Sequence, residues 1–232
     1  TCWKGSFEIV KYLVENGADI NLQGNCGNTP LHDACIKGHF EIVKYLIENG
    51  TNINIKNNKG NTPLQKACIK GHFELVKYLV ENGADINIQN KKGETPLHDT
   101  CYKDHFEIVK YLIENGADVN IQSIRGNTHL QFACWGGSFE IVKYLVENGA
   151  DINIQNNHGE TSLHDACFTG YFEIVKFLVE NCADIKIENN YGEIPLHYAF
   201  YKGHFEIVKY LVENGAEVNL IKDERVKNKI LK

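Results

Sequence analysis

Residues 27–59 read GNTPLHDACIKGHFEIVKYLIENGTNINIKNNK, and the chain is built from variants of this stretch in unbroken succession. Its first glycine recurs every 33 residues without insertion, at Gly27, Gly60, Gly93, Gly126, Gly159 and Gly192. A period of this size is typical of supersecondary units that stack on one another. The sequence therefore predicts one elongated array in place of a globular core.

The period also sets the boundaries of the units. Residues 1–26 form a truncated first unit, and the complete units are 27–59, 60–92, 93–125, 126–158, 159–191 and 192–224. We expect 1–224 to form a single domain and 225–232 a capping tail, with a short helix suggested by the spacing of Val226, Ile230 and Leu231. A chain that begins inside a unit and lacks methionine is expected to be an excerpt or a processed form.

Each unit predicts two short helices followed by an arm. Thr29 and Pro30 mark the start of the first helix, because a hydroxyl caps free N–H groups and proline fits the first position. Gly38 ends that helix. The second helix starts near Phe40, carries an apolar stripe and ends at Gly50. The following residues alternate isoleucine with polar residues and then turn, as in an extended arm.

These features resemble a known repeat family. The matching residues are Thr29-Pro30-Leu31-His32, Ala34, Gly38-His39, Gly50, Thr62-Pro63-Leu64 and Gly83-Ala84-Asp85-Ile86-Asn87. They are similar to the ankyrin repeat and its Thr-Pro-Leu-His-x-Ala signature. The resemblance implies an all-α solenoid of stacked helix-turn-helix units, with projecting β-hairpin or loop arms. It also implies a role in binding other proteins through the concave side.

Composition excludes several classes of protein. The chain is 43% hydrophobic and 23% charged, which is too apolar for disorder. No apolar run reaches the roughly 20 residues of a membrane helix, so we expect no membrane insertion. A net charge of −6 argues against a nucleic-acid partner.

The cysteines fit a structural role better than a metal or disulfide role. Six of them occupy one repeat position in the first helix, at Cys2, Cys35, Cys68, Cys101, Cys134 and Cys167. Stacked helices lie roughly 8–10 Å apart, beyond the roughly 4.4–6.8 Å between Cα atoms that a disulfide requires. We therefore expect small, unpaired core residues and a reducing, cytoplasmic location.

The histidines also recur by repeat position, one ending the Thr-Pro-Leu-His motif and one lying between the helices. In the ankyrin family the first is a structural hydrogen-bonding residue, and Gln65 and Gln131 replace it in two units. Glutamine can form such bonds but is a poor zinc ligand. No nucleophile elbow or phosphate-binding loop is present, so we expect no metal, no cofactor and no enzymatic activity.

Candidate binding residues are those that vary between units. The residue after the helix-one cysteine is apolar or aromatic throughout, and the family resemblance places it in the groove. These positions are Trp3, Ile36, Ile69, Tyr102, Trp135, Phe168 and Tyr201. A lysine rim runs beside them, including Lys37, Lys70 and Lys103. An exposed ladder of this kind favours partner binding; the alternative is that the side chains pack on each other or on the arms.

Two further positions vary. The arm tips include Asn58-Lys59, Lys91-Lys92 and Ile124-Arg125. The residues after the motif histidine are Asp33, Lys66, Asp99, Phe132, Asp165 and Tyr198. Ile124, Arg125, Phe132 and Trp135 are unusual together, and His129 breaks the motif beside them. This junction is interpreted as the centre of the binding groove, with drift in a redundant middle repeat as the alternative.

The sequence favours a non-enzymatic module, expected to be monomeric, that binds a protein or peptide in a concave groove. The lysine rim favours an acidic partner. The alternative is a spacer or scaffold segment of a larger protein, such as an effector, adaptor or channel, whose activity lies elsewhere. Two substitutions at capping positions, Cys182 for glycine and Ile194 for threonine, are expected to affect stability rather than binding.

Overall fold

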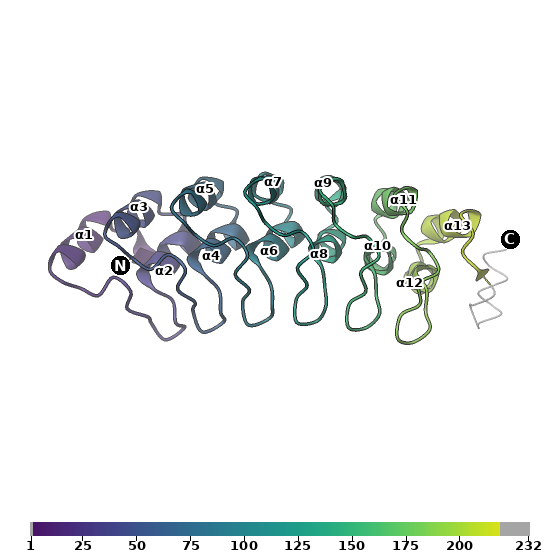
Figure 1. Cartoon of the computed structure of the whole chain (residues 1–232), viewed down its shortest axis with the longest axis horizontal. Helices are drawn as coiled ribbons and strands as arrows, with labels where there is room; N and C mark the ends of the chain where they lie inside the picture. The colour runs from purple at the N-terminus through teal and green to yellow at the C-terminus, as the bar shows by residue number, and fades with distance from the viewer. Residues whose placement is uncertain (1, 219–232) are drawn as a thin grey trace. The chain divides into compact units, whose positions relative to one another are not determined.

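The computed structural model describes residues 2–218, and within them the secondary structure is entirely helical. The chain divides into two compact units, Thr1–Asp118 and Val119–Lys232. Each is an array of helix pairs joined by long loops, as Figure 1 shows. The predicted helix in the 225–232 tail lies outside the described residues.

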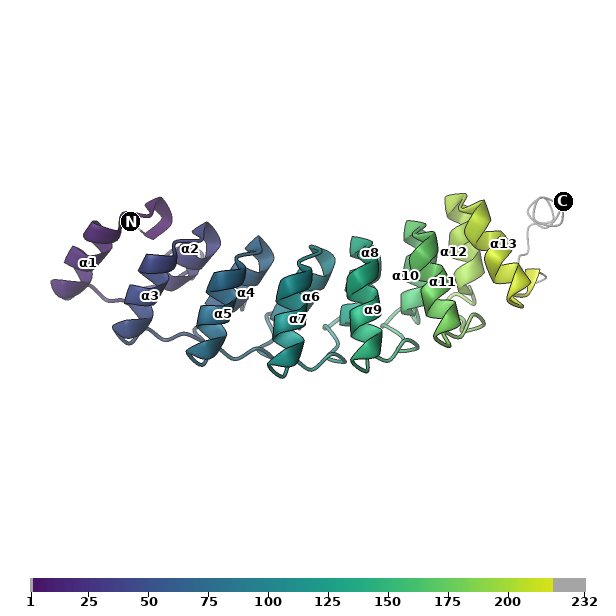
Figure 2. The same cartoon turned by 90° about the horizontal axis from the view of Figure 1, so that it is seen from above.

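The first unit holds a short 3₁₀ helix and seven α-helices. These are η1 (Cys2–Lys4), α1 (Phe7–Glu15), α2 (Pro30–Lys37), α3 (Phe40–Glu48), α4 (Pro63–Lys70), α5 (Phe73–Glu81), α6 (Pro96–Tyr102) and α7 (Phe106–Glu114). The second unit holds α8 (His129–Gly136), α9 (Phe139–Glu147), α10 (Ser162–Thr169), α11 (Phe172–Glu180), α12 (Pro195–Lys202) and α13 (Phe205–Glu213). Within each unit the first helices of successive repeats form one row and the second helices another (Figure 2).

The first helices α2, α4, α6, α8 and α10 each begin after a buried threonine, whereas α12 begins after Ile194. The backbone N–H of Thr29 donates to Nδ1 of His32 over 3.1 Å. Nε2 of the same ring lies 2.9 Å from the carbonyl oxygen of Asn61 in the next repeat. Because Nδ1 accepts, Nε2 is the donor, and the imidazole is neutral; burial lowers its pKa accordingly. The motif histidine thus links its helix to the neighbouring arm.

Residues in the left-handed conformation follow the helices. Gly38 takes φ +78° after α2, as the sequence predicts. Asp104 occupies the corresponding position after α6 with φ +59°, where the 33-residue register has glycine in the other complete repeats. Cys182 takes φ +68° after α11, which confirms the left-handed conformation expected there.

Stacking of first helices forms the core of each unit. In the first unit α2 packs on α4 and α4 on α6; in the second unit α8 packs on α10 and α10 on α12. Leu31, Ala34 and Cys35 are fully buried in this interface. The six cysteines at this position are all buried and free, as the small-core-residue interpretation predicts. A continuous core therefore arises from repeats that could not bury their faces singly.

The arms are turns and loops, without a β-strand in the described part of the chain. Within one arm the N–H of Asn57 donates to the carbonyl oxygen of Asn61 over 3.0 Å. Successive arms are joined by bonds such as Lys91 N–H to the carbonyl oxygen of Lys59, also at 3.0 Å. The loop form of the predicted arms is the one observed.

Candidate binding surface

In the first unit the predicted ladder has two partly buried side chains between two exposed ones. Trp3 and Tyr102 are 50% and 48% exposed, whereas Ile36 and Ile69 are partly buried. The two isoleucines therefore offer less surface to a partner than the aromatic residues do. The aromatic residues at either side remain accessible.

The lysine rim folds over these aromatic rings. Nζ of Lys37 lies 3.8 Å from the Trp3 ring centroid, and Nζ of Lys103 lies 5.2 Å from that of Tyr102. Both distances fall in the range of cation–π attraction. Lys70 is exposed beside Ile69. The rim and the ladder therefore form one surface, in which ammonium groups cover the faces of the rings.

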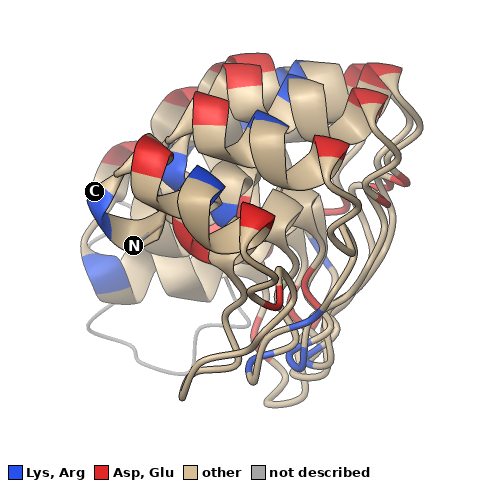
Figure 3. Cartoon of the chain, turned by 90° about the vertical axis from the view of Figure 1, so that its left-hand side faces the viewer, with Lys and Arg blue, Asp and Glu red and all other residues tan. Residues whose placement is uncertain are grey.

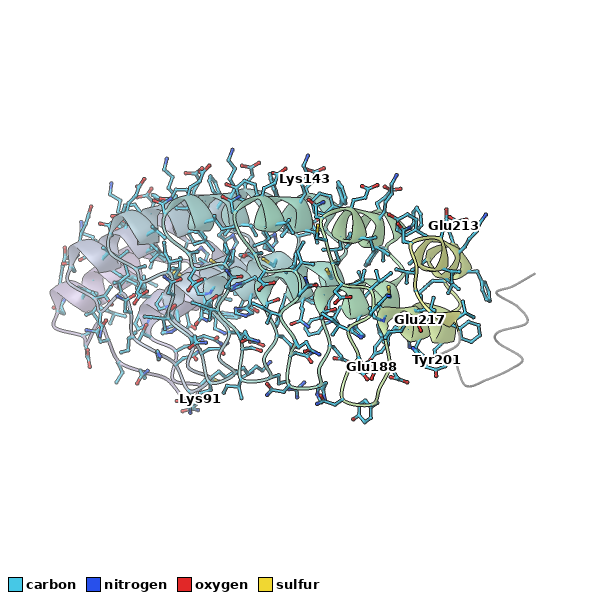
Figure 4. The ribbon with its side chains drawn as sticks, turned by 45° about the vertical axis from the view of Figure 1, so that its right-hand side comes forward. Lys91, Lys143, Glu188, Tyr201, Glu213 and Glu217 are labelled. Atoms are coloured by element: carbon cyan, nitrogen blue, oxygen red, sulfur yellow. The ribbon has the colours of Figure 1, made fainter. Side chains whose placement is uncertain are left out.

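The second unit repeats this arrangement at its far end. Phe168 and Tyr201 are 46% and 62% exposed. Nζ of Lys202 lies 4.0 Å from the Phe168 ring centroid. Figure 4 labels Tyr201 on the last helix pair, and shows Lys143 projecting from the outer helix row. The exposed ladder residues of this unit thus lie on α10 and α12.

The residues of the predicted junction divide between an arm tip and helix α8. Ile124 is 67% exposed and Arg125 is exposed, both at the tip. Phe132 and Trp135 are partly buried on α8, with ring centroids 5.0 Å apart. The structure brings these two rings together and leaves the tip residues open to solvent.

Trp135 is part of a buried polar network as well as the surface. Its indole hydrogen-bonds to the carboxylate of Asp165 on α10, and Gln131 Nε2 donates to Oδ2 of Asp165 over 3.0 Å. Asp165 is only 5% exposed. Burial raises its pKa to about 7, although the hydrogen bonds from Trp135 and Gln131 oppose the shift. The indole N–H therefore stabilises the stack and is not free for a partner.

Tyr198 is likewise held by hydrogen bonds within the second unit. Its hydroxyl donates to Oε1 of Glu160 over 2.5 Å and accepts from Nδ2 of Asn189 over 3.0 Å. Burial, followed by the bond to Glu160, raises the pKa of the phenol. Its ring centroid lies 6.2 Å from that of Phe168, so it supports an exposed neighbour.

His129 has a structural explanation that the sequence did not reveal. It replaces the proline of the motif, is fully buried, and places Nδ1 2.9 Å from the carbonyl oxygen of Val119. The side chain thus fastens α8 to the preceding segment of the chain. Part of the unusual composition at the junction is therefore internal packing.

A basic pocket in the first unit was not identified from the sequence. It has a volume of about 460 Å³ and lies among the arms that precede α4 and α6 and the faces of those helices. Its charged lining residues are Lys59, Lys66, Lys91, Lys92, Glu94 and Asp99. All except Glu94 belong to the variable positions of the array. Lys92 and Asp99 follow Lys59 and Lys66 by one repeat of 33 residues. This spacing is the signal in the sequence that could have predicted their stacking in neighbouring repeats.

Two other kinds of feature are missing from the described residues. Between residues 2 and 218, no three His, Cys, Asp or Glu side chains are grouped so that they could hold a metal ion. No helix in the same range combines the length and the apolar character needed to cross a membrane.

Comparison with known proteins identifies the repeat. A family model described as ankyrin repeats, in three copies, matches residues 1–90, 82–156 and 148–222. These matches extend over nearly the whole chain. No curated protein matches the sequence.

Proposed function

Since this chain belongs to the ankyrin-repeat family, whose arrays are general protein–protein interaction modules, we propose that it binds a protein or peptide along the groove between its first helices and its arms. The observation that carries this proposal is the exposure of apolar side chains at the variable positions of the second unit. Ile124, Phe168 and Tyr201 are each at least 46% exposed. Exposed aromatic and apolar residues grouped on one face favour an interface.

The second unit supplies the proposed centre of the interface. Ile124 and Arg125 offer an apolar contact and a guanidinium at one arm tip, where neither is covered. Phe132 and Trp135 offer ring surface on α8, already held in place by contact with each other. Side chains fixed before binding lose less conformational entropy when a partner arrives. Arg125 and the lysine rim favour an acidic partner.

The proposal is tested at the exposed tip, where substitutions leave the helix stack intact. Immobilised wild-type protein and Ile124→Ser and Arg125→Ala variants are used to capture partners, and retained proteins are identified and titrated by calorimetry. We expect each variant to weaken binding by about 2 kcal/mol, as for interface hot spots.

Leu22→Ser is the matched control, because Leu22 is also 67% exposed but lies on an arm of the first unit. Circular dichroism verifies that all three variants fold. A partner that binds the Ile124 and Arg125 variants as tightly as wild type would contradict this location of the interface.

Further parts of the proposal concern oligomeric state, activity and cellular compartment. We propose that it acts as a monomer, without enzymatic activity, and that nucleic acid is not its partner, given the net charge of −6. All eight cysteines are free, which favours a reducing compartment such as the cytoplasm. The alternative function is a spacer or scaffold segment in a larger protein. A groove that captures no partner, with the folded array intact, would favour that alternative.

A further inference from the structure

The pocket of the first unit concentrates positive charge in a protein that is negative overall. Lys59 and the pair Lys91 and Lys92 reach it from two successive arms, and Lys66 reaches it from α4. Figure 3 shows basic positions at the tips of the loops, and Figure 4 shows Lys91 at the tip of its arm. Backbone and side-chain bonds fix the two arms side by side, including Asn90 Nδ2 to Oδ1 of Asn61 over 3.0 Å.

The acidic residues of the pocket do not neutralise it. Glu94 is paired with Lys92, with Oε1 and Nζ 3.9 Å apart. Asp99 lines the pocket together with Lys59, Lys66 and Lys91, and no ion pair within 4.0 Å joins it to any of these three lysines. The lysines whose charges act on Asp99 are Lys66, Lys92 and Lys103. Lys66 is partly buried, and desolvation is the main reason that its pKa is lowered; the charge of Asp99 opposes this shift, and repulsion from Lys59 and Lys70 adds to it. The surplus of two positive charges is the charge that a dianion would balance.

Asp99 supplies a second, independent sign of a ligand. Its Oδ2 is buried and has no hydrogen-bond partner. An unsatisfied buried acceptor costs about 1–3 kcal/mol unless a donor reaches it. The equivalent residue of the second unit, Asp165, receives donors from Trp135 and Gln131. In the first unit Ile69 stands where that unit has Trp135, so no indole N–H is available to Asp99, and Ile69 lines the pocket instead.

We infer that this pocket binds a phosphorylated serine or threonine side chain of a peptide partner, an inference that rests on the proposed function in peptide binding. A phosphomonoester carries a charge of roughly −1.5 to −2 at neutral pH and three acceptor oxygens, which matches three unpaired ammonium groups. A backbone N–H of the peptide supplies the donor that Asp99 Oδ2 lacks. A volume of about 460 Å³ lies within the usual range for ligand sites.

The experiment uses a fluorescein-labelled nine-residue Gly-Ser peptide with one central phosphoserine, followed by fluorescence anisotropy. Companion peptides carry serine or glutamate at the same position, and inorganic phosphate is the competitor. We expect the phosphopeptide to bind at least tenfold more tightly than the glutamate peptide and the serine peptide not to bind. Phosphate alone should compete only weakly, because it lacks the peptide N–H.

The variants test each part of the pocket in the full chain. Lys66→Gln and Lys91→Gln should each weaken phosphopeptide binding about tenfold, the scale of one charge-assisted hydrogen bond. Asp99→Asn keeps an oxygen that can accept the peptide N–H but removes a negative charge beside the phosphate, and should tighten binding severalfold. Lys77→Gln is the matched control, since Lys77 is an exposed lysine on α5 outside the pocket.

Equal binding of the phosphoserine and glutamate peptides would overturn the phosphate assignment, and insensitivity to Lys66→Gln and Lys91→Gln would overturn the site. A phosphopeptide that binds none of the folded proteins would do the same. None of these outcomes affects the groove of the second unit, because its test relies on Ile124 and Arg125. If those two variants lose partner capture and no protein binds the phosphopeptide, the proposed function is supported and the phosphate site is refuted.

Discussion

Gln131 donates a hydrogen bond from Nε2 to Oδ2 of Asp165, 3.0 Å away, across the interface between α8 and α10. The same amide accepts the Thr128 N–H at Oε1 and donates to the carbonyl oxygen of Glu160. A glutamine at the motif-histidine position thus caps its own helix, holds the next arm and satisfies a buried carboxylate. A histidine has only two ring nitrogens, and the backbone bonds of His32 already use both.

Restoring the motif by Gln131→His should therefore destabilise the protein. The imidazole can replace the two backbone bonds but leaves Oδ2 of Asp165 without this donor, at a cost of about 1 kcal/mol. Urea denaturation measures the change. Gln65→His is the matched control, because Gln65 bonds to the backbone of Thr62 and Glu94 while Asp99 Oδ2 has no partner to lose. Equal effects of the two substitutions would contradict this explanation.

The buried carboxylate of Asp165 should make stability depend on pH. Its pKa is about 7 in the folded protein and near 3.9 when unfolded, so the native state holds the proton more firmly. Between these values the folded state binds more protons, and the free energy of unfolding falls as pH rises from about 4 to about 7.

Asp165→Asn removes this dependence, and the variant should gain stability over wild type with rising pH, by an amount of the order of 3 kcal/mol. Chemical denaturation at pH 4.5, 6 and 7.5 measures the difference. Asp184→Asn, an exposed carboxylate on an arm of the same unit, is the control. A difference between Asp165→Asn and wild type that does not change with pH would refute the assignment.

Repetition explains how much of the fold the sequence predicts. A motif such as Thr-Pro-Leu-His occurs several times at the same repeat position. The helix starts, the Gly38 cap and the buried cysteines can therefore all be predicted from one repeat. What repetition cannot supply is the contact between unlike residues of neighbouring repeats. The bond of Trp135 to Asp165 and the inward turn of His129 depend on side-chain directions that no periodicity encodes.

The same limit applies to the candidate site. The sequence separates variable positions from common ones, and both the Ile124 tip and the basic pocket lie among the variable positions. It does not reveal that Trp135 is partly buried while Ile124 is open. Nor does it show that Asp99 Oδ2 is buried without a hydrogen-bond donor in a pocket that four lysines also line. Exposure and hydrogen bonding across repeats decide which variable residues can contact a partner.

Cys182→Gly should stabilise the second unit. Cys182 takes φ +68°, a conformation that costs a residue with a β-carbon about 1 kcal/mol. Thermal and urea unfolding should show a gain of about that size. Gly149→Ala is the reciprocal control, because Gly149 has φ +88° and a β-carbon added there would meet no other atom within 4 Å. A neutral Cys182→Gly would show that the cysteine side chain has a compensating contact.

Gly170→Ala should cost more than Gly149→Ala. Both glycines have positive φ, but a β-carbon at Gly170 would overlap Cε1 of His204 in the next repeat. The ring would have to leave its position, in which Nε2 is 3.3 Å from the carbonyl oxygen of Phe168. We expect an extra loss of about 1 kcal/mol. In the Gly170→Ala/His204→Ala double variant the extra loss of stability should disappear. If the extra loss remains, the clash involves a residue other than His204.

Trp135 should show separate contributions to stability and to binding. Trp135→Phe keeps a ring beside Phe132 but loses the indole hydrogen bond to Asp165, so stability should fall by about 1 kcal/mol. Because the N–H is used internally, partner affinity should change little in this variant. Trp135→Ala also removes the ring surface, and its affinity should fall by about 2 kcal/mol.

Urea denaturation and calorimetric titration of the captured partner measure the two quantities in the same variants, below the temperature at which Trp135→Ala begins to unfold. Tyr144→Phe is the control for a ring on the outer helix α9, away from the first-helix row. If Trp135→Phe weakens binding as much as Trp135→Ala, the partner must compete for the indole N–H, and binding would then have to break the bond to Asp165.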